Sequence, residues 1–317
     1  MFEKKYITFR GESAILVITG GECDLADTFE CGQAFRYECT AREPGYAEYV
    51  TVVGDKVLRV GQEKRGELIF FGLDDESFEA TARPYFALDT DFEAIREEIK
   101  SLTDSEWLRR AADAARGIII LKQDPWEALF SFIISQNNNI PRIRKIIRAI
   151  SAEYGENLAK ASGSLTCPLD KNKPLPDDAV CRACGACYSF PSADAVAKKP
   201  DGLLPSHPGF RYKYLVDAAK RVTDGRTDLK DISDRGEYEY TRERLKEILG
   251  VGDKVAACVA LFGFSNLEAF PIDVWMKRAI DEYFGGKLDP TSLGKYAGVA
   301  QQYIFHYIRN LEKEQNM

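Results

Sequence analysis

The sequence contains no long hydrophobic run. Its longest apolar clusters, such as RGIIIL and ALFSFII, are far shorter than the roughly 20 residues that a membrane-spanning helix needs. The N-terminal segment MFEKKYITFR carries charges where a secretory signal peptide would have an apolar core. We therefore expect a protein that makes no contact with a membrane and resides in the cytoplasm.

The sequence also lacks a basic excess and has few histidines. Its formal net charge is -7, so it offers no general attraction to nucleic acid, although local basic clusters can bind phosphate on an acidic protein. The two histidines, His207 and His306, are too few and too far apart to suggest a histidine metal site. With 45% hydrophobic and 29% charged residues, the composition is that of a globular protein.

The eight cysteines show no sign of a secreted disulfide framework. In a cytosolic chain they are expected to be thiols, metal ligands or reactive groups. Four of them, with the spacing Cys-x13-Cys-x2-Cys-x2-Cys, lie in an insertion at about residues 160–187 that is rich in Gly, Ser, Pro, Lys and Asp. They are Cys167, Cys181, Cys184 and Cys187.

This spacing suits a structural zinc ion or an iron–sulfur cluster, which would staple the insertion rather than perform chemistry. The alternative is a loop with free thiols. Three other cysteines near the N-terminus, Cys23, Cys31 and Cys39, are predicted to be buried strand residues.

The order of predicted elements indicates an α+β protein. Roughly the first 75 residues contain six strand-like segments rich in aromatic and β-branched residues, with no helical pattern between them, which favours an antiparallel sheet. From about residue 89 the periodicity becomes helical. We predict an antiparallel β-sheet domain over residues 1–100 and a helical region over residues 101–317.

The segment NNNIPRIRKIIRAISAEYG predicts an amphipathic helix. Isoleucines from Ile143 to Ile150 follow the i, i+3, i+4, i+7 spacing of one helix face, while basic residues such as Arg142 lie away from it. Asn139 suits the N-cap and Pro141 suits the first turn.

The segment LKEILGVGDKVAACVALFGF predicts two helices joined by a tight turn, at about residues 241–263. Backbone N–H groups of a Gly250-Val251-Gly252 turn can converge beside a helix N-terminus and bind a DNA phosphate. Lys254 and Cys258 are four residues apart and share one face of the second helix. A plain inter-helix turn with a solvated lysine is the alternative.

Two further features are ambiguous by themselves. Asp273 follows Pro-x at the start of a predicted helix, where an aspartate is a natural N-cap. Gln301 and Phe305 are four residues apart on the last predicted helix, a spacing that also fits an exposed glutamine and a core phenylalanine.

Six segments in order resemble the 8-oxoguanine DNA glycosylase family of the helix-hairpin-helix superfamily, and together they span most of the chain. The segments are CGQAFRY (31–37), DPWEALFSFIISQNNNIPRI (124–143), YSFPS (188–192), GFRYKYL (209–215), GVGDKVAACV with FPIDVWM, and AGVAQQYIF (297–305).

The resemblance implies a lysine nucleophile, to which Lys254 corresponds, that attacks the sugar C1′ and remains as a Schiff base until β-elimination nicks the strand. Asp273 corresponds to the carboxylate that stabilises positive charge on the sugar. This chemistry requires no metal or nucleotide cofactor.

The resemblance also implies a pocket for a base flipped out of the duplex. Cys258 and Phe305 correspond to the residues that sandwich the base, and Gln301 to the residue that recognises its Watson–Crick edge. Gly32 corresponds to the glycine whose carbonyl accepts from N7–H, a donor in 8-oxoguanine but a lone pair in guanine.

Residues around the opposite strand follow from the same resemblance. Asn137, Arg142 and Arg211 correspond to residues that hold the cytosine opposite the lesion, and Phe210 to an aromatic wedge. The chain departs from the family at Trp275, where many relatives have a histidine near a phosphate.

The resulting prediction is a base-excision repair enzyme, a DNA glycosylase with AP lyase activity on 8-oxoguanine. Its partner is double-stranded DNA containing 8-oxoguanine opposite cytosine, and we expect a monomer associated with the nucleoid when bound. The alternatives are an alkylated-base (3-methyladenine-type) glycosylase and a non-catalytic helix-hairpin-helix DNA-binding protein. Lys254 argues against the first because such enzymes usually lack the hairpin lysine.

Overall fold

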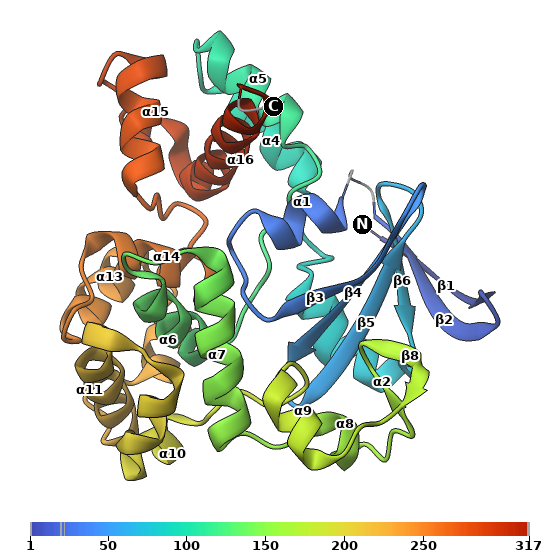
Figure 1. Cartoon of the computed structure of the whole chain (residues 1–317). Helices are drawn as coiled ribbons and strands as arrows, with labels where there is room; N and C mark the ends of the chain where they lie inside the picture. The colour runs from blue at the N-terminus through green and yellow to red at the C-terminus, as the bar shows by residue number, and fades with distance from the viewer. Residues whose placement is uncertain (1, 20, 22, 316–317) are drawn as a thin grey trace.

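The computed structural model describes residues 2–19, 21 and 23–315. Its N-terminal part is a six-stranded antiparallel sheet (Figure 1). The strand order is β1-β2-β6-β5-β4-β3. The strands are β1 (Glu3–Phe9), β2 (Glu12–Ile18), β3 (Tyr37–Glu43), β4 (Tyr46–Val53), β5 (Lys56–Gln62) and β6 (Glu67–Phe71). The predicted antiparallel sheet and α+β class are confirmed.

One expectation about this region is wrong, because a helix, α1 (Leu25–Glu30), lies between β2 and β3. Asp24 caps it by accepting from the Asp27 N–H, and Leu25 and Phe29 are fully buried on one face. Strand-like segments on both sides masked this six-residue helix.

The buried face of the sheet carries an aromatic core. Phe29 stacks on Tyr49 with ring centroids 5.1 Å apart, and Phe70 packs edge-on against Phe78 and Phe86. Short helical segments follow the sheet, namely α2 (Asp75–Ser77), the π-helix η1 (Phe78–Ala82) and α3 (Arg83–Tyr85); Phe78 begins η1, and Phe86 directly follows α3. Through these ring contacts, the segment that leads into the helical region packs against the sheet.

The rest of the chain is largely helical. Its main helices are α4 (Phe92–Ser101), α5 (Glu106–Ala114), α6 (Pro125–Ser135), α7 (Ile140–Tyr154), α8 (Leu158–Ala161), α10 (Ala193–Lys198), α11 (Tyr212–Thr223), α12 (Leu229–Arg235), α13 (Tyr238–Lys246), α14 (Asp253–Gly263), α15 (Val274–Phe284) and α16 (Ala297–Gln315). Three 3-10 helices connect them, namely η2 (Pro200–Ser206), η3 (Gly209–Arg211) and η4 (Pro290–Tyr296).

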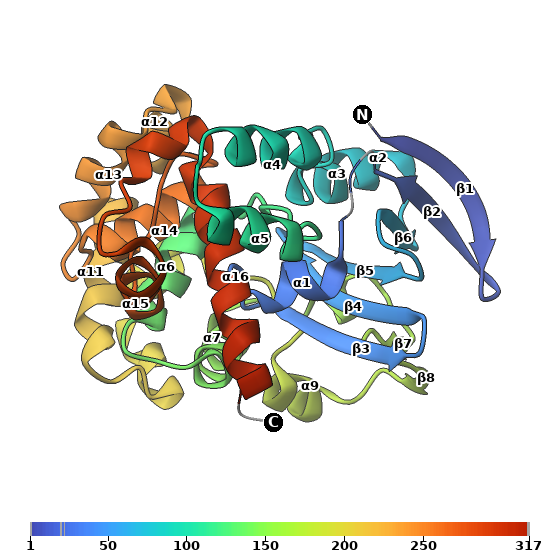
Figure 2. The same ribbon diagram turned by 90° about the horizontal axis from the view of Figure 1, so that it is seen from above.

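The last helix, α16, packs against helices that come much earlier in the chain. It packs against α4 and α5 and runs beside α15, so the C-terminal part of the chain lies against the first two helices of the helical region (Figure 2). Ile95 and Ile99 of α4 belong to the large helical core, whereas the strands belong to a separate core. The division into domains near residue 100 stays a prediction.

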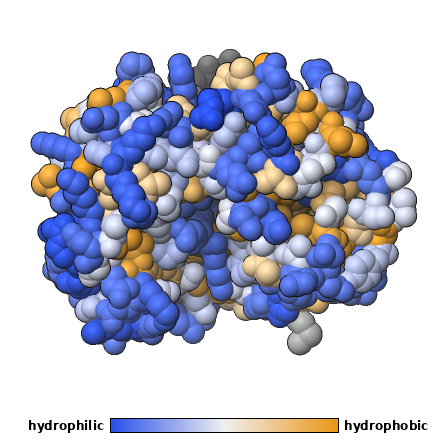
Figure 3. Space-filling model, turned by 90° about the horizontal axis from the view of Figure 1, so that it is seen from below, coloured by the Kyte–Doolittle hydropathy of each residue, from blue (hydrophilic) through white to orange (hydrophobic). Residues whose placement is uncertain are grey.

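The cysteine insertion folds into a small hairpin, β7 (Thr166–Cys167) with β8 (Asp170–Pro174), followed by α9 (Asp178–Cys184) beside α7. None of the α9 residues is buried. The face of the molecule seen from below is mostly hydrophilic, with separate apolar patches (Figure 3). Within the described residues, no helix is long and apolar enough to cross a membrane.

Candidate active site

One pocket of about 410 Å³ brings together six of the residues singled out in the sequence. It opens between the turn joining α6 to α7, the helix α14, the start of α15 and the first half of α16. These six, which line it together with other residues, are Gly32, Lys254, Cys258, Asp273, Gln301 and Phe305. They come from positions far apart in the chain, so the fold, rather than local sequence, assembles the pocket.

The hairpin between α13 and α14 requires glycine at its first position. Gly250 has φ +80°, and a Cβ there would lie 2.5 Å from the Tyr214 ring. Gly252 is the N-cap of α14 and provides no side-chain cap. The first backbone N–H groups of α14 therefore lack a capping acceptor from this residue, which leaves them available for an anion such as a phosphate.

Lys254 and Cys258 lie one helical turn apart on α14, facing the pocket. The Lys254 Nζ lies 5.4 Å from the centre of the Phe132 ring, which forms part of the wall. Cys258 is buried, and burial raises the pKa of its thiol while the neighbouring Lys254 amine opposes the shift. The thiol is therefore a neutral packing surface.

Asp273 is held at the N-terminus of α15. Its Oδ1 accepts from the Met276 N–H at 2.8 Å, which makes it the N-cap, and the side chain is only partly buried. The cap orients the carboxylate at the edge of the pocket, so the structural and chemical interpretations of Asp273 are compatible.

Gly32 lies on the opposite wall with φ +88°, in contact range of Ile140 and Phe305. The next residue, Gln33, is fully buried. Its amide donates to the carbonyls of Thr28 and Ile119, and its Oε1 accepts from the Leu121 N–H at 2.9 Å. This network fixes the backbone at Gly32, a function that the sequence analysis did not assign to Gln33.

The helix α16 presents two adjacent glutamines to the pocket. Gln301 and Gln302 are 3% and 5% exposed, and the Gln302 Nε2 donates to the Gln301 Oε1 at 2.6 Å. One turn further on, Phe305 forms part of the wall, and the Arg309 guanidinium lies 5.4 Å from the centre of its ring. Gln302 and Arg309 were missed by the sequence analysis because helical periodicity does not distinguish a pocket from a core.

The residues predicted to hold the opposite cytosine lie around the turn after α6, outside the pocket wall. Asn137 is exposed and adopts φ +48°, and Arg211 is 3% exposed. Arg211 donates to the carbonyls of Gln136 and Asn137, and burial together with the nearby Arg142 charge lowers its pKa. Arg211 thus supports this turn.

Two exposed groups flank that turn. Arg142 is exposed, and no ion pair is found for it among the residues that the structure describes. Phe210 is 48% exposed, with the Arg211 guanidinium 4.4 Å from the centre of its ring. An exposed aromatic ring and an exposed arginine suit contact with DNA bases and phosphates.

Trp275, the departure from the family pattern, is partly buried and lines the pocket near Asp273. An indole donates one N–H but cannot become cationic. Any contact with a phosphate at this position is therefore a neutral hydrogen bond.

None of the four insertion cysteines forms a disulfide bond, and across residues 2–19, 21 and 23–315 no group of three or more His, Cys, Asp or Glu side chains is arranged to hold a metal ion. Burial raises the pKa of Cys187 to about 12, and the thiols of Cys184, Cys167 and Cys181 add to the shift. The prediction for the N-terminal cysteines is partly wrong, since Cys39 is exposed and neither Cys23 nor Cys31 lies in a strand.

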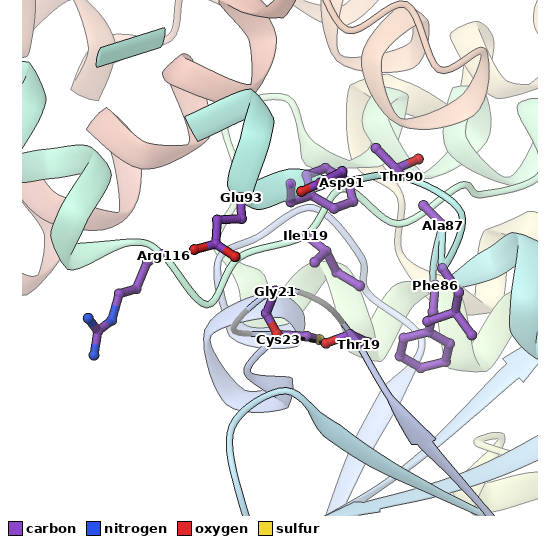
Figure 4. A pocket seen from close by; sticks show the side chains of 12 residues that line it. Thr19, Gly21, Cys23, Phe86, Ala87, Thr90, Asp91, Glu93, Arg116 and Ile119 are labelled. Carbon is purple, nitrogen blue, oxygen red and sulfur yellow. Dashed lines mark hydrogen bonds between the residues drawn. The ribbon is translucent and has the colours of Figure 1, made fainter. Parts of the chain in front are cut away.

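A smaller hollow lies at the junction of the sheet with α4 (Figure 4). Its volume is about 40 Å³, and Thr19, Cys23, Phe86 and Glu93 contribute to its lining. The Arg116 guanidinium points away from it (Figure 4). Because a hollow of this size holds a water molecule rather than a base, it does not compete with the pocket described above.

Comparisons with known proteins agree with this geometry. The family described as 8-oxoguanine DNA glycosylase, N-terminal domain, matches residues 15–129. The N-glycosylase/DNA lyase of Saccharomyces cerevisiae is 28% identical over 291 residues, covering 83% of this chain and 69% of the yeast protein.

Solved structures extend the similarity over the whole chain. The Clostridium acetobutylicum 8-oxoguanine glycosylase/lyase, in complex with double-stranded DNA containing cytosine opposite 8-oxoG, is 30% identical with a TM-score of 0.79 and covers 98% of each chain. A 3-methyladenine DNA glycosylase from Archaeoglobus fulgidus, 17% identical with a TM-score of 0.65, covers 93% of this chain and 98% of its own and shares the fold alone.

The fold and the lysine-bearing hairpin at a base-sized pocket define a DNA glycosylase of the helix-hairpin-helix class. The 30% identity to the Clostridium acetobutylicum enzyme, over almost the full length of both chains, narrows the class to one family. The chain belongs to the 8-oxoguanine DNA glycosylase family.

Proposed function

We propose that this protein excises 8-oxoguanine from double-stranded DNA and then cleaves the abasic strand, acting in base-excision repair. The observation that carries this function is the convergence of Lys254, Asp273 and four base-recognition residues on one pocket. The related Clostridium enzyme, crystallised on DNA with cytosine opposite 8-oxoG, supports the same lesion pair as the substrate here. An N-glycosylase/DNA lyase from yeast supports the combination of two activities.

In the first step, the Lys254 amine attacks C1′ of the damaged nucleotide. The bond between C1′ and N9 breaks, its electron pair leaves with the base, and the base takes up a proton. Positive charge develops on the sugar as this bond breaks, and the Asp273 carboxylate at the pocket edge stabilises it. Because the cap holds this carboxylate before substrate arrives, little reorganisation is needed.

In the second step, the lysine-bound sugar opens to an imine at C1′. Loss of a C2′ proton and departure of the 3′ phosphate group give β-elimination, which nicks the strand. Water then hydrolyses the imine and regenerates the Lys254 amine. The bonds that form and break in these two steps require only the lysine amine, a carboxylate and a proton acceptor, so no step needs a cofactor.

Base recognition takes place after the lesion leaves the helical stack. We assign the walls of the sandwich to Cys258 and Phe305, which both line the pocket. The carbonyl of Gly32 accepts from N7–H, which 8-oxoguanine has and guanine lacks. The Gln33 network holds this carbonyl in place, and a rigid acceptor repels the N7 lone pair of guanine.

Contacts with the rest of the duplex are assigned to the exposed groups around the turn after α6. Phe210 fills the gap left by the flipped base, and Arg142 and Asn137 meet the opposite cytosine. Arg211 supports them through the carbonyls of Gln136 and Asn137, and it contributes donors to the cytosine when that turn rearranges. The hairpin of Gly250, Val251 and Gly252 binds a backbone phosphate.

The cysteine insertion is assigned a structural role outside the chemistry. A zinc ion or an iron–sulfur cluster on its four cysteines remains a prediction from their spacing. Metal analysis of purified protein by inductively coupled plasma mass spectrometry, with Cys184→Ser as the control, tests it. We propose that the protein acts as a monomer in the cytoplasm, bound to the nucleoid when it engages DNA.

The proposed function is tested by single-turnover assays on three duplexes that differ only at one base pair. They carry 8-oxoguanine, guanine or 3-methyladenine, the first two opposite cytosine and the third opposite thymine. We expect base release and strand nicking with 8-oxoguanine alone. Release of 3-methyladenine in preference to 8-oxoguanine would instead support the alkylated-base alternative, and binding without any base release would support the non-catalytic alternative.

A further inference from the structure

A second hollow, separate from the pocket around Lys254, lies between α7 and α9 and has a volume of about 620 Å³. All the charged residues that line it are basic, namely Arg144, Lys145, Arg148 and Arg182, and no Asp or Glu from the described part of the chain contributes to its lining. In a chain whose net charge is -7, this is a local concentration of positive charge. We refer to this hollow as the basic groove.

The second wall of the groove comes from the cysteine insertion, whose helix α9 packs beside α7 (Figure 1). Gly185, directly after α9, permits the close approach. A Cβ at this position would lie 2.5 Å from the Arg148 carbonyl oxygen, and its φ of +66° also favours glycine. Arg182 of α9 donates to the Ala152 carbonyl of α7 at 2.6 Å. The groove is therefore formed by two helices in fixed contact.

The charges around the groove are only partly neutralised. Glu38 on β3 forms ion pairs with both Arg144 and Arg148, so one carboxylate serves two guanidinium groups, and the Arg148 side chain remains 34% exposed. Lys145 and Arg182 are exposed, and no ion pair is found for either of them among the residues that the structure describes. The groove thus carries an excess of positive charge within reach of an anion in solution.

The groove begins beside the pocket around Lys254. Ile140 and Pro141, at the start of α7, line both of them. In the chain, these two residues lie between Asn137 and Arg142, which the proposed function places at the opposite cytosine. Because an α-helix rises about 1.5 Å per residue, Arg148 lies about 12 Å along α7 from Ile140. This length matches the axial rise of about three to four base pairs.

We propose that the basic groove binds backbone phosphates of the undamaged DNA strand, about two to four nucleotides from the cytosine opposite the lesion. Lysine and arginine contact phosphates whatever the base sequence, and DNA presents phosphates at a regular spacing along the strand. The undamaged strand is favoured because the turn before α7 is assigned to its cytosine and the groove continues from that turn. This inference rests on the proposed function, since the cytosine sets the position of the strand.

The salt dependence of binding counts the phosphate contacts. Fluorescence anisotropy is measured on a duplex with 8-oxoguanine opposite cytosine, with Lys254→Gln as the parent protein so that the base is not released. Adding Lys145→Gln or Arg182→Gln should each lower the slope of log K against log salt concentration by about one, and both together by about two. Adding Lys230→Gln, which removes the same charge from α12 outside the groove, is the matched control and should leave the slope unchanged.

Of the two groove variants, Lys145→Gln isolates the effect of charge. No side-chain hydrogen bond or ion pair is found for Lys145 among the described residues, so its melting temperature should equal that of the parent protein. In the wild-type background, Lys145→Gln should raise the apparent Kd for the duplex by about 2- to 5-fold, as expected for one exposed ion pair. A loss confined to the rate of base release at saturating protein would overturn the proposal.

Neutral backbone linkages locate the contact on the DNA. Methylphosphonates replace the phosphates two to four nucleotides from the cytosine in the undamaged strand, on one side of the cytosine or on the other. On one of the two sides they should weaken binding of the parent protein by about 3- to 10-fold. With Lys145→Gln and Arg182→Gln combined, the same linkages should cost less than about twofold, because the contacts are already lost.

An unchanged salt slope in Lys145→Gln, or an equal fall in Lys230→Gln, would overturn the proposal. Methylphosphonates that weaken the parent protein and the combined variant equally on both sides of the cytosine would do the same. Each of these results leaves the proposed function standing, because base release by the wild type tests that function separately. Failure of the wild type to release 8-oxoguanine would overturn the proposed function, and the assignment of the groove to the undamaged strand with it.

Discussion

The pocket around Lys254 and the cysteine insertion are built in opposite ways. The pocket lies among helices whose inner faces are almost completely buried, such as α14, where every residue from Val255 to Phe262 is buried. The insertion consists of a short hairpin and the helix α9, none of whose residues is buried. Its ion pairs, such as that between Lys160 and Asp178, lie between exposed side chains and stabilise little.

The difference separates two ways of holding reactive side chains in place. Lys254 and Asp273 are positioned by packing and by a helix cap, so their geometry exists before any ligand binds. The thiols of the insertion have no comparable framework, and a bound ion would have to supply it. Substitutions at the pocket should therefore change rates, whereas changes in the insertion should leave rates alone.

The largest expected effect comes from Lys254→Gln, which removes the proposed nucleophile and keeps the length of the side chain. Base release and nicking of 8-oxoguanine DNA should fall by about 1,000-fold or more, because no other amine in the pocket replaces it. Lys230→Gln on α12, an exposed lysine paired with Asp234, is the matched control and should retain the wild-type rate. Equal rates for the two variants would contradict the assignment of the nucleophile.

Asp273→Asn should lower the rate of base release by about 100- to 1,000-fold, because it removes the carboxylate charge proposed to stabilise positive charge on the sugar. Asparagine caps helices as well as aspartate does, so the free energy of unfolding should change little. Asp273→Ala additionally removes the cap and should cost about 1 kcal/mol in urea unfolding. If the asparagine variant lost as much stability as the alanine variant, the cap would not be the structural role of Asp273.

Gly250→Ala tests the backbone of the hairpin. Its positive φ and a Cβ 2.5 Å from the Tyr214 ring should destabilise the fold by about 2 to 4 kcal/mol in urea unfolding. Gly252→Ala is the matched control, since Gly252 has a negative φ and no atom lies within 4 Å of a Cβ there. Similar losses of stability at both positions would show that the positive φ and the contact with Tyr214 do not cause the loss at Gly250.

Alkylation of the chelator-treated protein compares two thiols within the insertion. Cys184 is exposed, whereas burial and the neighbouring thiols raise the pKa of Cys187 to about 12. A raised pKa lowers the thiolate fraction at pH 8, so Cys187 should react with iodoacetamide at least about 10-fold more slowly than Cys184. Peptide mass spectrometry measures both rates, and faster reaction at Cys187 would contradict its buried placement.

The smallest expected effect comes from shortening the insertion hairpin. The Leu175 N–H donates to the Leu165 carbonyl at 2.9 Å, so residues 166–174 can be replaced by an Asn-Gly turn without moving the ends. The rate of 8-oxoguanine release should stay within about twofold of wild type, because surface changes away from a packed site cost little. A loss above tenfold would mean that the insertion supports the pocket after all.

The sequence was most informative where a local motif carries the geometry. The caps at Asn139 and Asp273 and the glycine turn before Lys254 depend on neighbours within a few residues, and each lies where it was predicted. The six strands could be predicted from their aromatic and β-branched residues and from the turn residues between them, whereas α1 was missed because it is short. The functional roles of these residues came from the resemblance to a family rather than from periodicity.

Long-range contacts explain what the sequence could not predict. Gln33 supports Gly32 through Ile119 and Leu121, more than 80 residues further along the chain, and no spacing indicates such a partner. Arg211 was expected to face DNA, yet in this structure it holds the carbonyls of Gln136 and Asn137. The place of Gln302 in the pocket lining likewise depends on which face of α16 meets the pocket.

The central claim is that Lys254 forms a covalent bond with the damaged nucleotide. Borohydride trapping on a duplex with one 8-oxoguanine opposite cytosine tests it most directly, with Lys254→Gln and an undamaged duplex as controls. The account predicts a stable protein–DNA adduct that requires both the lesion and Lys254. An adduct that persists in Lys254→Gln, or base release by the wild type without any adduct, would contradict it.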